Sequence, residues 1–163
     1  MKRKKYLLGA GLLCTILAAS LCLSHITSVS AKRAFHALDG VEIVLDPGHG
    51  GKDDGARSNE AKEQEINLKI AQKLKKLLET GGAHVTMTRE GAYDLASENA
   101  TNRKREDMKK RMELINQEKT DLFLSIHLNS YPNTSVKGAQ AFYAPKNEVS
   151  KVFADILQKH LRA

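Results

Sequence analysis

The chain has 163 residues, with 26 lysines and arginines against 19 aspartates and glutamates, which gives a formal net charge of +7. Four of the basic residues lie in residues 1–31, which contain no acidic residue, so the rest of the chain carries only +3 and lacks the charge signature of a nucleic-acid-binding protein. Both cysteines, Cys14 and Cys22, also lie in that first segment. A disulfide framework, a thiolate metal site and a cysteine nucleophile are therefore excluded from residues 32–163.

Residues 1–31 have the composition of a targeting segment. A basic start is followed by an almost wholly apolar run from Tyr6 to Leu23, and small residues at 29–31 offer a cleavage site. The apolar run is also long enough to approach a membrane span. We therefore expect either a cleaved signal peptide or a membrane anchor, and in both cases an extracytoplasmic domain. Neither cysteine follows a lipobox, so lipidation is not expected, and residues 32–40 are predicted to be a linker.

Strands and helices are predicted to alternate after the linker. Apolar residues mark a strand over 41–46, which Pro47 and Gly48 end. Helical spacing over 63–79 predicts a helix with an apolar face of Ile66, Ile70, Leu74, Leu77 and Leu78. A strand over 83–88 follows. The polar residues 91–102 then form a connection that either borders a substrate groove or is an ordinary solvated loop.

The second half continues the alternation. A helix is predicted over 103–117, with Met108, Met112 and Ile115 on its buried side and its basic residues in solvent. Strands over 121–127 and 138–144 come next, and a helix over 148–161 has an apolar face of Val149, Val152, Phe153, Ile156 and Leu157. This order predicts one α/β domain over 41–163, with a largely parallel or mixed sheet and helices on both of its faces.

Two histidines follow apolar strands directly, His49 after the first and His127 after the third. A lone histidine at a strand end is more often a hydrogen-bonded structural residue, but two of them at the carboxyl ends of strands are typical of a metal site at a sheet edge. Glu60, Glu63 and Glu65 offer a third ligand beside the helix start, although Glu60 and Glu65 are explained by the helix dipole alone. The other histidines are predicted to be structural or exposed: His25, His36, His84 and His160.

Four sequence blocks occur in the order of a known family. In chain order they are 46–51 with 54–56, 63–68, Thr88-Arg89, and 125–129 with Gly138-Ala139. Arg111 and Asn116, which precede the last block, also match the pattern of that family. Over residues 41–163 the chain thereby resembles the zinc-dependent N-acetylmuramoyl-L-alanine amidases of the bacterial cell wall, the amidase-3 family. Within it, residues 94–96 and the basic run to Lys110 are most similar to the sporulation-specific cortex amidase.

The resemblance implies hydrolysis of the amide between N-acetylmuramic acid and L-alanine in peptidoglycan, with one zinc ion held by His49, Glu63 and His127. Asn129 is expected either to bind substrate or to support the ligands or a turn. Asp46 is expected only to support the ligands or a turn. Gln64 departs from the family's usual lysine.

The family's catalytic glutamate belongs to a late block that resembles Glu-x-Gly-Phe-Leu-Ser-Asn, and residues 1–163 contain no such block. We therefore expect a C-terminally truncated amidase domain whose general base lies beyond Ala163. As written, the chain is expected to be a weak or inactive amidase, or a non-catalytic module that binds the wall or a protein partner. A different metal-dependent hydrolase is the other alternative, and the four blocks argue against it.

Overall fold

The computed structural model describes residues 20, 36–58, 61–116, 119–128 and 138–161. Contacts divide the chain into two units, residues 1–128 and 129–163, and each is considered by itself. The predicted targeting segment lies outside the described residues except for Ser20, and so does Asn129. Within the described ranges, no helix is both long and apolar enough to cross a membrane.

The first unit is built on a three-stranded parallel sheet. β1 (Glu42–Pro47) lies in the middle, between β2 (His84–Met87) and β3 (Leu122–Ile126). Ile43 of β1 is in register with Val85 of β2 and with Leu122 of β3, so the carboxyl ends of all three strands meet at one edge. The predicted strands over 41–46, 83–88 and 121–127 are confirmed within a residue or two at each end.

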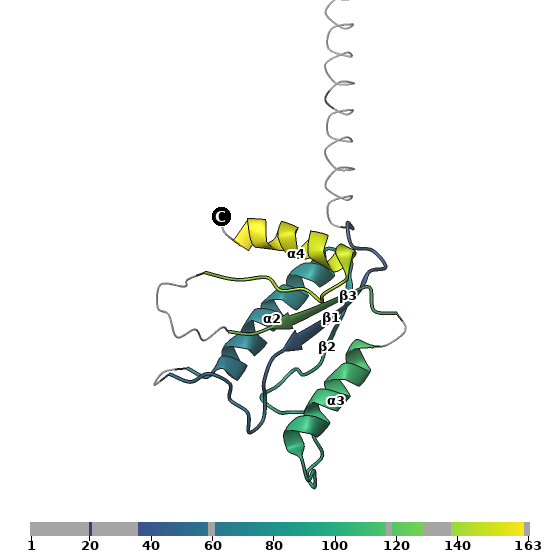
Figure 1. Ribbon diagram of the computed structural model, residues 1–163. Helices are drawn as coiled ribbons and strands as arrows, with labels where there is room; N and C mark the ends of the chain where they lie inside the picture. Colours follow the sequence, from purple (N-terminus) through teal and green to yellow (C-terminus); the bar gives the residue numbers. More distant parts are fainter. Residues whose placement is uncertain (1–19, 21–35, 59–60, 117–118, 129–137, 162–163) are drawn as a thin grey trace, which may run out of the picture. The chain divides into compact units, whose positions relative to one another are not determined.

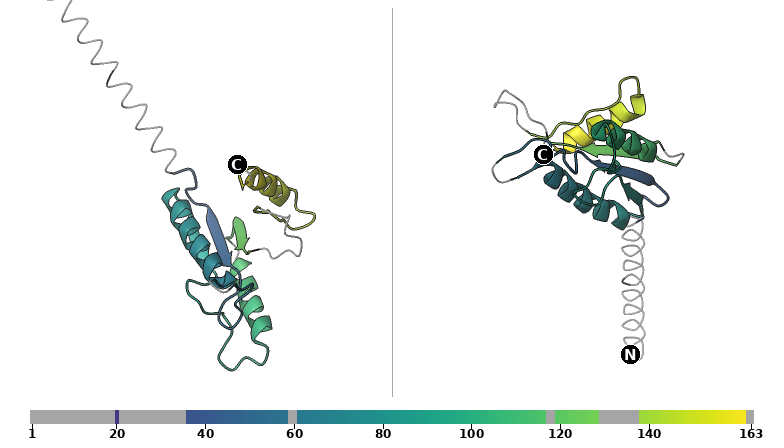
Figure 2. Two further views of the ribbon diagram at one scale, coloured as in Figure 1. Left: turned by 90° about the vertical axis from the view of Figure 1, so that its left-hand side faces the viewer. Right: turned by 90° about the horizontal axis from the view of Figure 1, so that it is seen from below.

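Two helices connect these strands and cover the sheet. α2 (Glu63–Thr80) links β1 to β2, and α3 (Arg103–Ile115) links β2 to β3. The connection through α2 runs from β1 to β2 on one side of it, and the connection through α3 runs back past β1 to β3 on the other side. Because these two connections run in opposite directions along the sheet and both are right-handed, α2 and α3 lie on opposite faces. Figure 1 and Figure 2 show α2 and α3 on the two sides of the strands. The predicted α/β fold with helices on both faces is thus confirmed.

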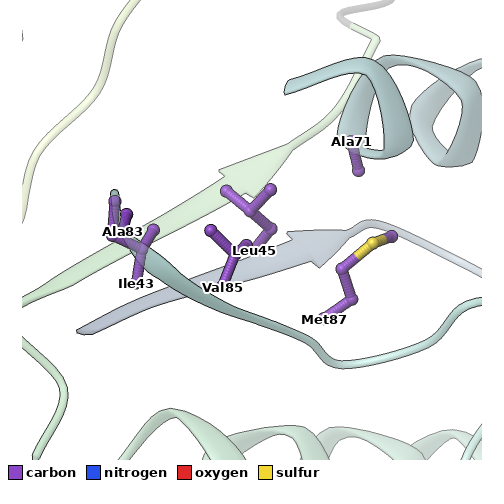
Figure 3. Close-up of a cluster of buried hydrophobic side chains, with 6 residues drawn as sticks. All are labelled: Ile43, Leu45, Ala71, Ala83, Val85 and Met87. Carbon is purple, nitrogen blue, oxygen red and sulfur yellow. The ribbon is translucent and has the colours of Figure 1, made fainter. Parts of the chain in front are cut away.

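The hydrophobic core lies between the sheet and α2. Figure 3 shows its six buried side chains, which are Ile43, Leu45, Ala71, Ala83, Val85 and Met87. Leu74 and Leu78 of α2 pack against this cluster as predicted, together with Leu68. The predicted apolar face is wrong in part, because Ile70 is exposed and Leu77 is 71% exposed. The helix is turned so that Asn67 and Ala71, both fully buried, are central to the packed face.

The sheet-facing side of α3 is polar, which differs from the prediction. Met108 and Met112 were expected to be buried, but each is 49% exposed. Among the described residues of this helix, Arg111 is the buried one. Its guanidinium finds acceptors on β1 and on the turn after it, so hydrogen bonds rather than apolar contacts hold this face of the helix.

The second unit contains α4 (Glu148–Leu161), which confirms the predicted helix. The predicted strand over 138–144 is wrong, since these residues form no strand. One side chain of α4 satisfies their backbone instead: Ala141 N donates to Gln158 Oε1 at 2.8 Å, and Gln158 Nε2 donates to Ala139 O at 3.1 Å. The predicted apolar face of α4 is largely exposed, with Val149 at 81%.

Candidate metal centre

Two adjacent parallel strands bring His49 and His127 together. β1 and β3 end at the same edge, and Gly48 N donates to Ile126 O at 2.9 Å, which extends the pairing one step past the strands. His49 follows at once with a positive φ of 63°, and His127 follows β3 directly. The two rings meet edge to face, with centroids 4.9 Å apart and planes at 79°.

The carboxylate of Glu63 meets both rings. Glu63 is the first residue of α2 and is buried, with its Oε1 lying 3.2 Å from His49 Nε2 and 3.2 Å from His127 Nδ1. These separations match the edge, about 3.3 Å, of a tetrahedron whose arms are about 2.0–2.1 Å long, as in zinc sites. Two imidazoles and one carboxylate are also the donor set of one class of catalytic zinc site. The ligand atoms of all three residues lie within 4.8 Å of one another, so the group could hold a metal ion, and its donor set suits zinc.

Neighbouring groups keep Glu63 ionised. Ala56 N donates to Oε2 at 2.8 Å, and Leu128 N donates to Oε1 at 2.9 Å. Burial raises the pKa of this carboxyl, but these two amides, Asn67 and His49 outweigh burial and hold the pKa below its usual range. A metal ligand must be deprotonated, so this environment suits cation binding at neutral pH.

Two glycines make room for the cluster. A Cβ on Gly48 would overlap the His127 ring, and a Cβ on Gly55 would lie 2.6 Å from His49 Cδ2 and 2.7 Å from Glu63 Oε2. Gly55 also has a φ of +68°, which glycine adopts without penalty. The turn after β1 and the segment before α2 therefore form a cradle that only glycine at these positions leaves open.

Replacing Gly48 with alanine should displace the His127 ring and lower zinc affinity by at least about tenfold, the effect of losing an orienting contact. The φ of Gly48 is not positive, so the new methyl acts through the ring rather than through backbone strain. Competition with a zinc chelator measures the affinity. Gly81→Ala is the matched control because it meets only α2 and Leu38, and zinc affinity equal to wild type in Gly48→Ala would contradict the cradle.

Buried Arg89, just beyond β2, ties three segments together. Its Nε donates to Pro47 O at 2.9 Å, and its Nη2 donates to Gly48 O at 2.9 Å and to Gln64 O at 2.8 Å. Its Nη1 reaches Gly91 O at 2.8 Å. One guanidinium thus joins the turn after β1, the start of α2 and the loop after β2.

Arg111 holds the same turn from the other face of the sheet. Its Nη2 donates to His49 O at 2.6 Å, and its Nη1 donates to Pro47 O at 3.0 Å and pairs with Asp46 Oδ1 at 2.6 Å. Arg89 and Arg111 together therefore occupy the carbonyls of three consecutive residues, 47–49. These bonds stabilise the left-handed backbone at His49, which is uncommon for a residue other than glycine.

Asp46 joins strands rather than a histidine. Its carboxylate accepts from Thr88 Oγ1 at 2.6 Å and from Ser125 Oγ at 2.9 Å, besides Arg111. Burial raises its pKa, but these hydrogen bonds and the charge of Arg111 bring the pKa below the usual range. Asp46 thus connects the ends of all three strands to α3, and its part in the site is to support the turn that carries His49.

Asp53, which no sequence prediction named, contacts the outer side of the His49 ring. Its Oδ1 lies 3.1 Å from His49 Nδ1, and its Oδ2 accepts from Lys104 Nζ of α3 at 2.6 Å. Burial raises its pKa, but Lys104, His49 and the Gly55 amide lower it to about 2. The only sequence signal was its place four residues after His49, between the two parts of the first family block, 46–51 and 54–56.

The connection over 91–102 is tied to the turn and to α3. Gly51 N donates to Ala92 O at 2.7 Å, and Arg103 binds both carboxylate oxygens of Asp94 at 2.8 and 2.9 Å. Leu95 N donates to Asp107 Oδ1 at 2.8 Å. These contacts hold the segment against the turn after β1 and against α3, and its place at the border of a substrate groove stays a prediction.

Residues 43–163 match the family model described as N-acetylmuramoyl-L-alanine amidase. The chain belongs to this amidase family. The match covers the sheet, α2, α3 and α4, and it confirms the family that the sequence blocks indicated.

Individual amidases are similar in sequence to this family member. The germination-specific N-acetylmuramoyl-L-alanine amidase of Bacillus subtilis is 41% identical over 128 residues, which are 77% of this chain and 54% of the relative. The amidase AmiA of Escherichia coli is 32% identical over 123 residues, covering 72% of this chain and 37% of that protein. The chain thus spans about half the length of the Bacillus relative.

A solved relative shares the fold. The CwlD amidase from Clostridioides difficile, determined in complex with the GerS lipoprotein, has a TM-score of 0.70 and 38% sequence identity. The match covers 75% of this chain and 65% of that one. It confirms the α/β architecture of the amidase domain.

The other predicted positions of this family member lie apart from the cluster. Glu65 is exposed in the first turn of α2, where it faces the helix dipole, and Glu60 lies outside the described residues. His36, His84 and His160 are exposed as predicted, and His25 lies outside the described residues. Gln64, in place of the family's lysine, donates to Asp54 and to Gly51 O.

Proposed function

We propose that this protein is a zinc-dependent amidase that hydrolyses the bond between N-acetylmuramic acid and L-alanine in peptidoglycan, with His49, Glu63 and His127 as the zinc ligands. One observation carries the proposal: two imidazole nitrogens converge on one buried carboxylate oxygen, each at 3.2 Å, in a chain of the amidase family.

The chain supplies a preorganised site for this chemistry. A zinc ion bound there would polarise the scissile carbonyl and lower the pKa of a bound water toward neutrality. Glu63 contributes a negative charge, and the two histidines contribute neutral ligands. The arginine-held turn and the glycine cradle fix their positions before any ion binds, so little reorganisation is needed.

Digestion of purified peptidoglycan tests the proposal. The zinc-loaded protein should release stem peptides that begin with a free L-alanine amine, as detected by mass spectrometry, and a chelator or Glu63→Gln should abolish that product. Release of peptides cut at another bond, or equal release after chelation, would contradict the proposal.

A catalytically impaired wall-binding or partner-binding module is the second candidate. Residues 1–163 contain no block of the kind to which the family resemblance assigns the catalytic glutamate. Positioned proton transfer is worth about 10²–10⁴-fold in rate, so a chain without a positioned base would act as such a module rather than as an efficient enzyme. The test compares the 163-residue chain with one extended through such a block. Equal turnover by the two would show that the base lies within residues 1–163.

We place the activity outside the cytoplasm, at wall or spore-cortex peptidoglycan. The relatives are named as germination-specific and cell wall amidases, and residues 1–31 have the composition of a signal peptide or an anchor. The full chain should fractionate with the membrane or outside the cell, whereas residues 32–163 alone should stay in the cytoplasm. A wholly cytoplasmic full chain would contradict this placement.

A further inference from the structure

The His49 ring is held between two carboxylates. Glu63 Oε1 lies 3.2 Å from Nε2, on the side where the three candidate ligands meet, and Asp53 Oδ1 lies 3.1 Å from Nδ1 on the opposite side. A carboxylate that accepts the Nδ1 proton leaves the Nε2 lone pair free for a cation and sets the plane of the ring.

Asp53 is itself fixed on both of its oxygens. Gly50 and Asp53 exchange two backbone hydrogen bonds, at 2.9 and 3.0 Å, which close a tight turn and bring the Asp53 side chain back toward His49. Gly55 N then donates to Oδ1 at 3.2 Å, and Lys104 Nζ donates to Oδ2 at 2.6 Å. A carboxylate held at both oxygens is able to orient a ring.

Lys104 brings α3 into this arrangement. Lys104 and Arg111 are seven residues apart, two helical turns, so they lie on the same face of α3. Arg111 binds the His49 carbonyl at 2.6 Å, while Lys104 reaches the ring through Asp53. The helix therefore contacts both the backbone and the side chain of His49.

We propose that Asp53 and Lys104 are positioning residues for His49: Asp53 sets the orientation and tautomer of the ring, and Lys104 locks Asp53 from α3. This inference rests on the proposed zinc site. It adds that α3, which supplies no ligand, contributes to zinc affinity through a lysine on its surface.

Zinc affinity measured by chelator competition tests the pair. Asp53→Ala should weaken binding by about 10–100-fold, the usual cost of losing the partner of a ligand histidine. Asp53→Asn keeps an oxygen for Gly55 N and His49 Nδ1 and should lose less. Lys104→Met should lose about two- to fivefold, because the ion pair it removes is partly exposed.

Each variant has a matched control. Asp39 also pairs with a histidine, but that pair with His36 is exposed and lies outside the cluster, so Asp39→Ala should leave zinc affinity unchanged. Lys109 is on the same helix as Lys104 but pairs with Glu113, so Lys109→Met should also change nothing. Thermal unfolding of the metal-free proteins separates positioning from folding, since Lys104→Met should lose affinity while keeping the wild-type melting temperature.

The outcomes separate this inference from the proposed site. If the wild-type protein binds no zinc, both are overturned. If the wild type binds zinc through His49 and His127 but the Asp53 and Lys104 variants match their controls, only the positioning role is overturned. If Asp53→Ala does not fold, the Lys104→Met and Lys109→Met comparison decides the question.

Discussion

Replacing His127 with alanine is expected to lower zinc affinity by more than about 100-fold, beyond the usual cost of losing an orienting partner. His127 Nδ1 is one of two nitrogens that approach Glu63 Oε1 at 3.2 Å, and catalytic zinc sites ordinarily use three protein ligands. His49→Ala should have the same effect. Glu63→Gln should be at least as damaging, because it removes the charge of the site and offers an amide in its place.

Zinc content after dialysis and chelator competition measure this loss. His84→Ala is the control, since His84 is an exposed histidine of β2 outside the cluster. Metal-free unfolding should change little in His127→Ala, because half of the ring is exposed. Full zinc occupancy in both histidine variants would show that the ion binds outside the cluster of His49, Glu63 and His127.

Replacing Arg111 with methionine should lower the free energy of unfolding by about 3–5 kcal/mol, the cost of removing one partner from a buried ion pair. The change leaves the Asp46 carboxylate buried without its cation, and it also removes the arginine donor to His49 O and one of the two arginine donors to Pro47 O. The methionine keeps much of the volume, so the loss is chiefly electrostatic.

Urea unfolding of the metal-free protein measures that change, with Arg105→Met on the exposed side of α3 as the control. The two variants should differ strongly, and similar unfolding free energies would contradict a supporting role for Arg111.

The stability of the wild-type protein should also depend on pH in the acid range. The pKa of Asp46 is lowered in the folded protein, so its contribution is complete above the ordinary value of 3.8 and is lost as the pH falls through the folded value. Arg111→Met should show a weaker form of that acid-dependent loss.

The strand predictions succeeded where local pattern and tertiary packing agree. β1 is a run of apolar residues ended by Pro47 and Gly48, and such a run is buried wherever a parallel sheet has helices on both faces. For residues 138–144 the local pattern predicted a strand, but tertiary packing forms none there. In the structure a single glutamine of α4 satisfies backbone groups there, and a side-chain contact of that kind leaves no periodic signal.

The faces of the helices were less predictable. Apolar spacing in α2 indicated the correct helix but placed Leu77 in the core, because spacing alone does not set how far a helix is rotated on its sheet. In α3 the spacing favoured two methionines as the buried side. The structure buries Arg111 instead, since two carbonyls and a carboxylate of β1 and the turn after it meet its guanidinium.

The family, the parallel α/β fold and the three residues that converge could be predicted from the sequence, because strand-end histidines and a glutamate at a helix start are local features in a specific order. The contacts that support these three residues became visible only in the folded structure. Arg89, Lys104 and Arg111 reach the turn after β1 or Asp53 across 41, 51 and 62 residues of chain, which no local pattern records. Asp53 is only four residues from His49, but it meets the ring because the Gly50–Asp53 backbone hydrogen bonds fold the turn back. Their roles depend on which atoms meet after the strands pair and the helices pack on the two faces of the sheet.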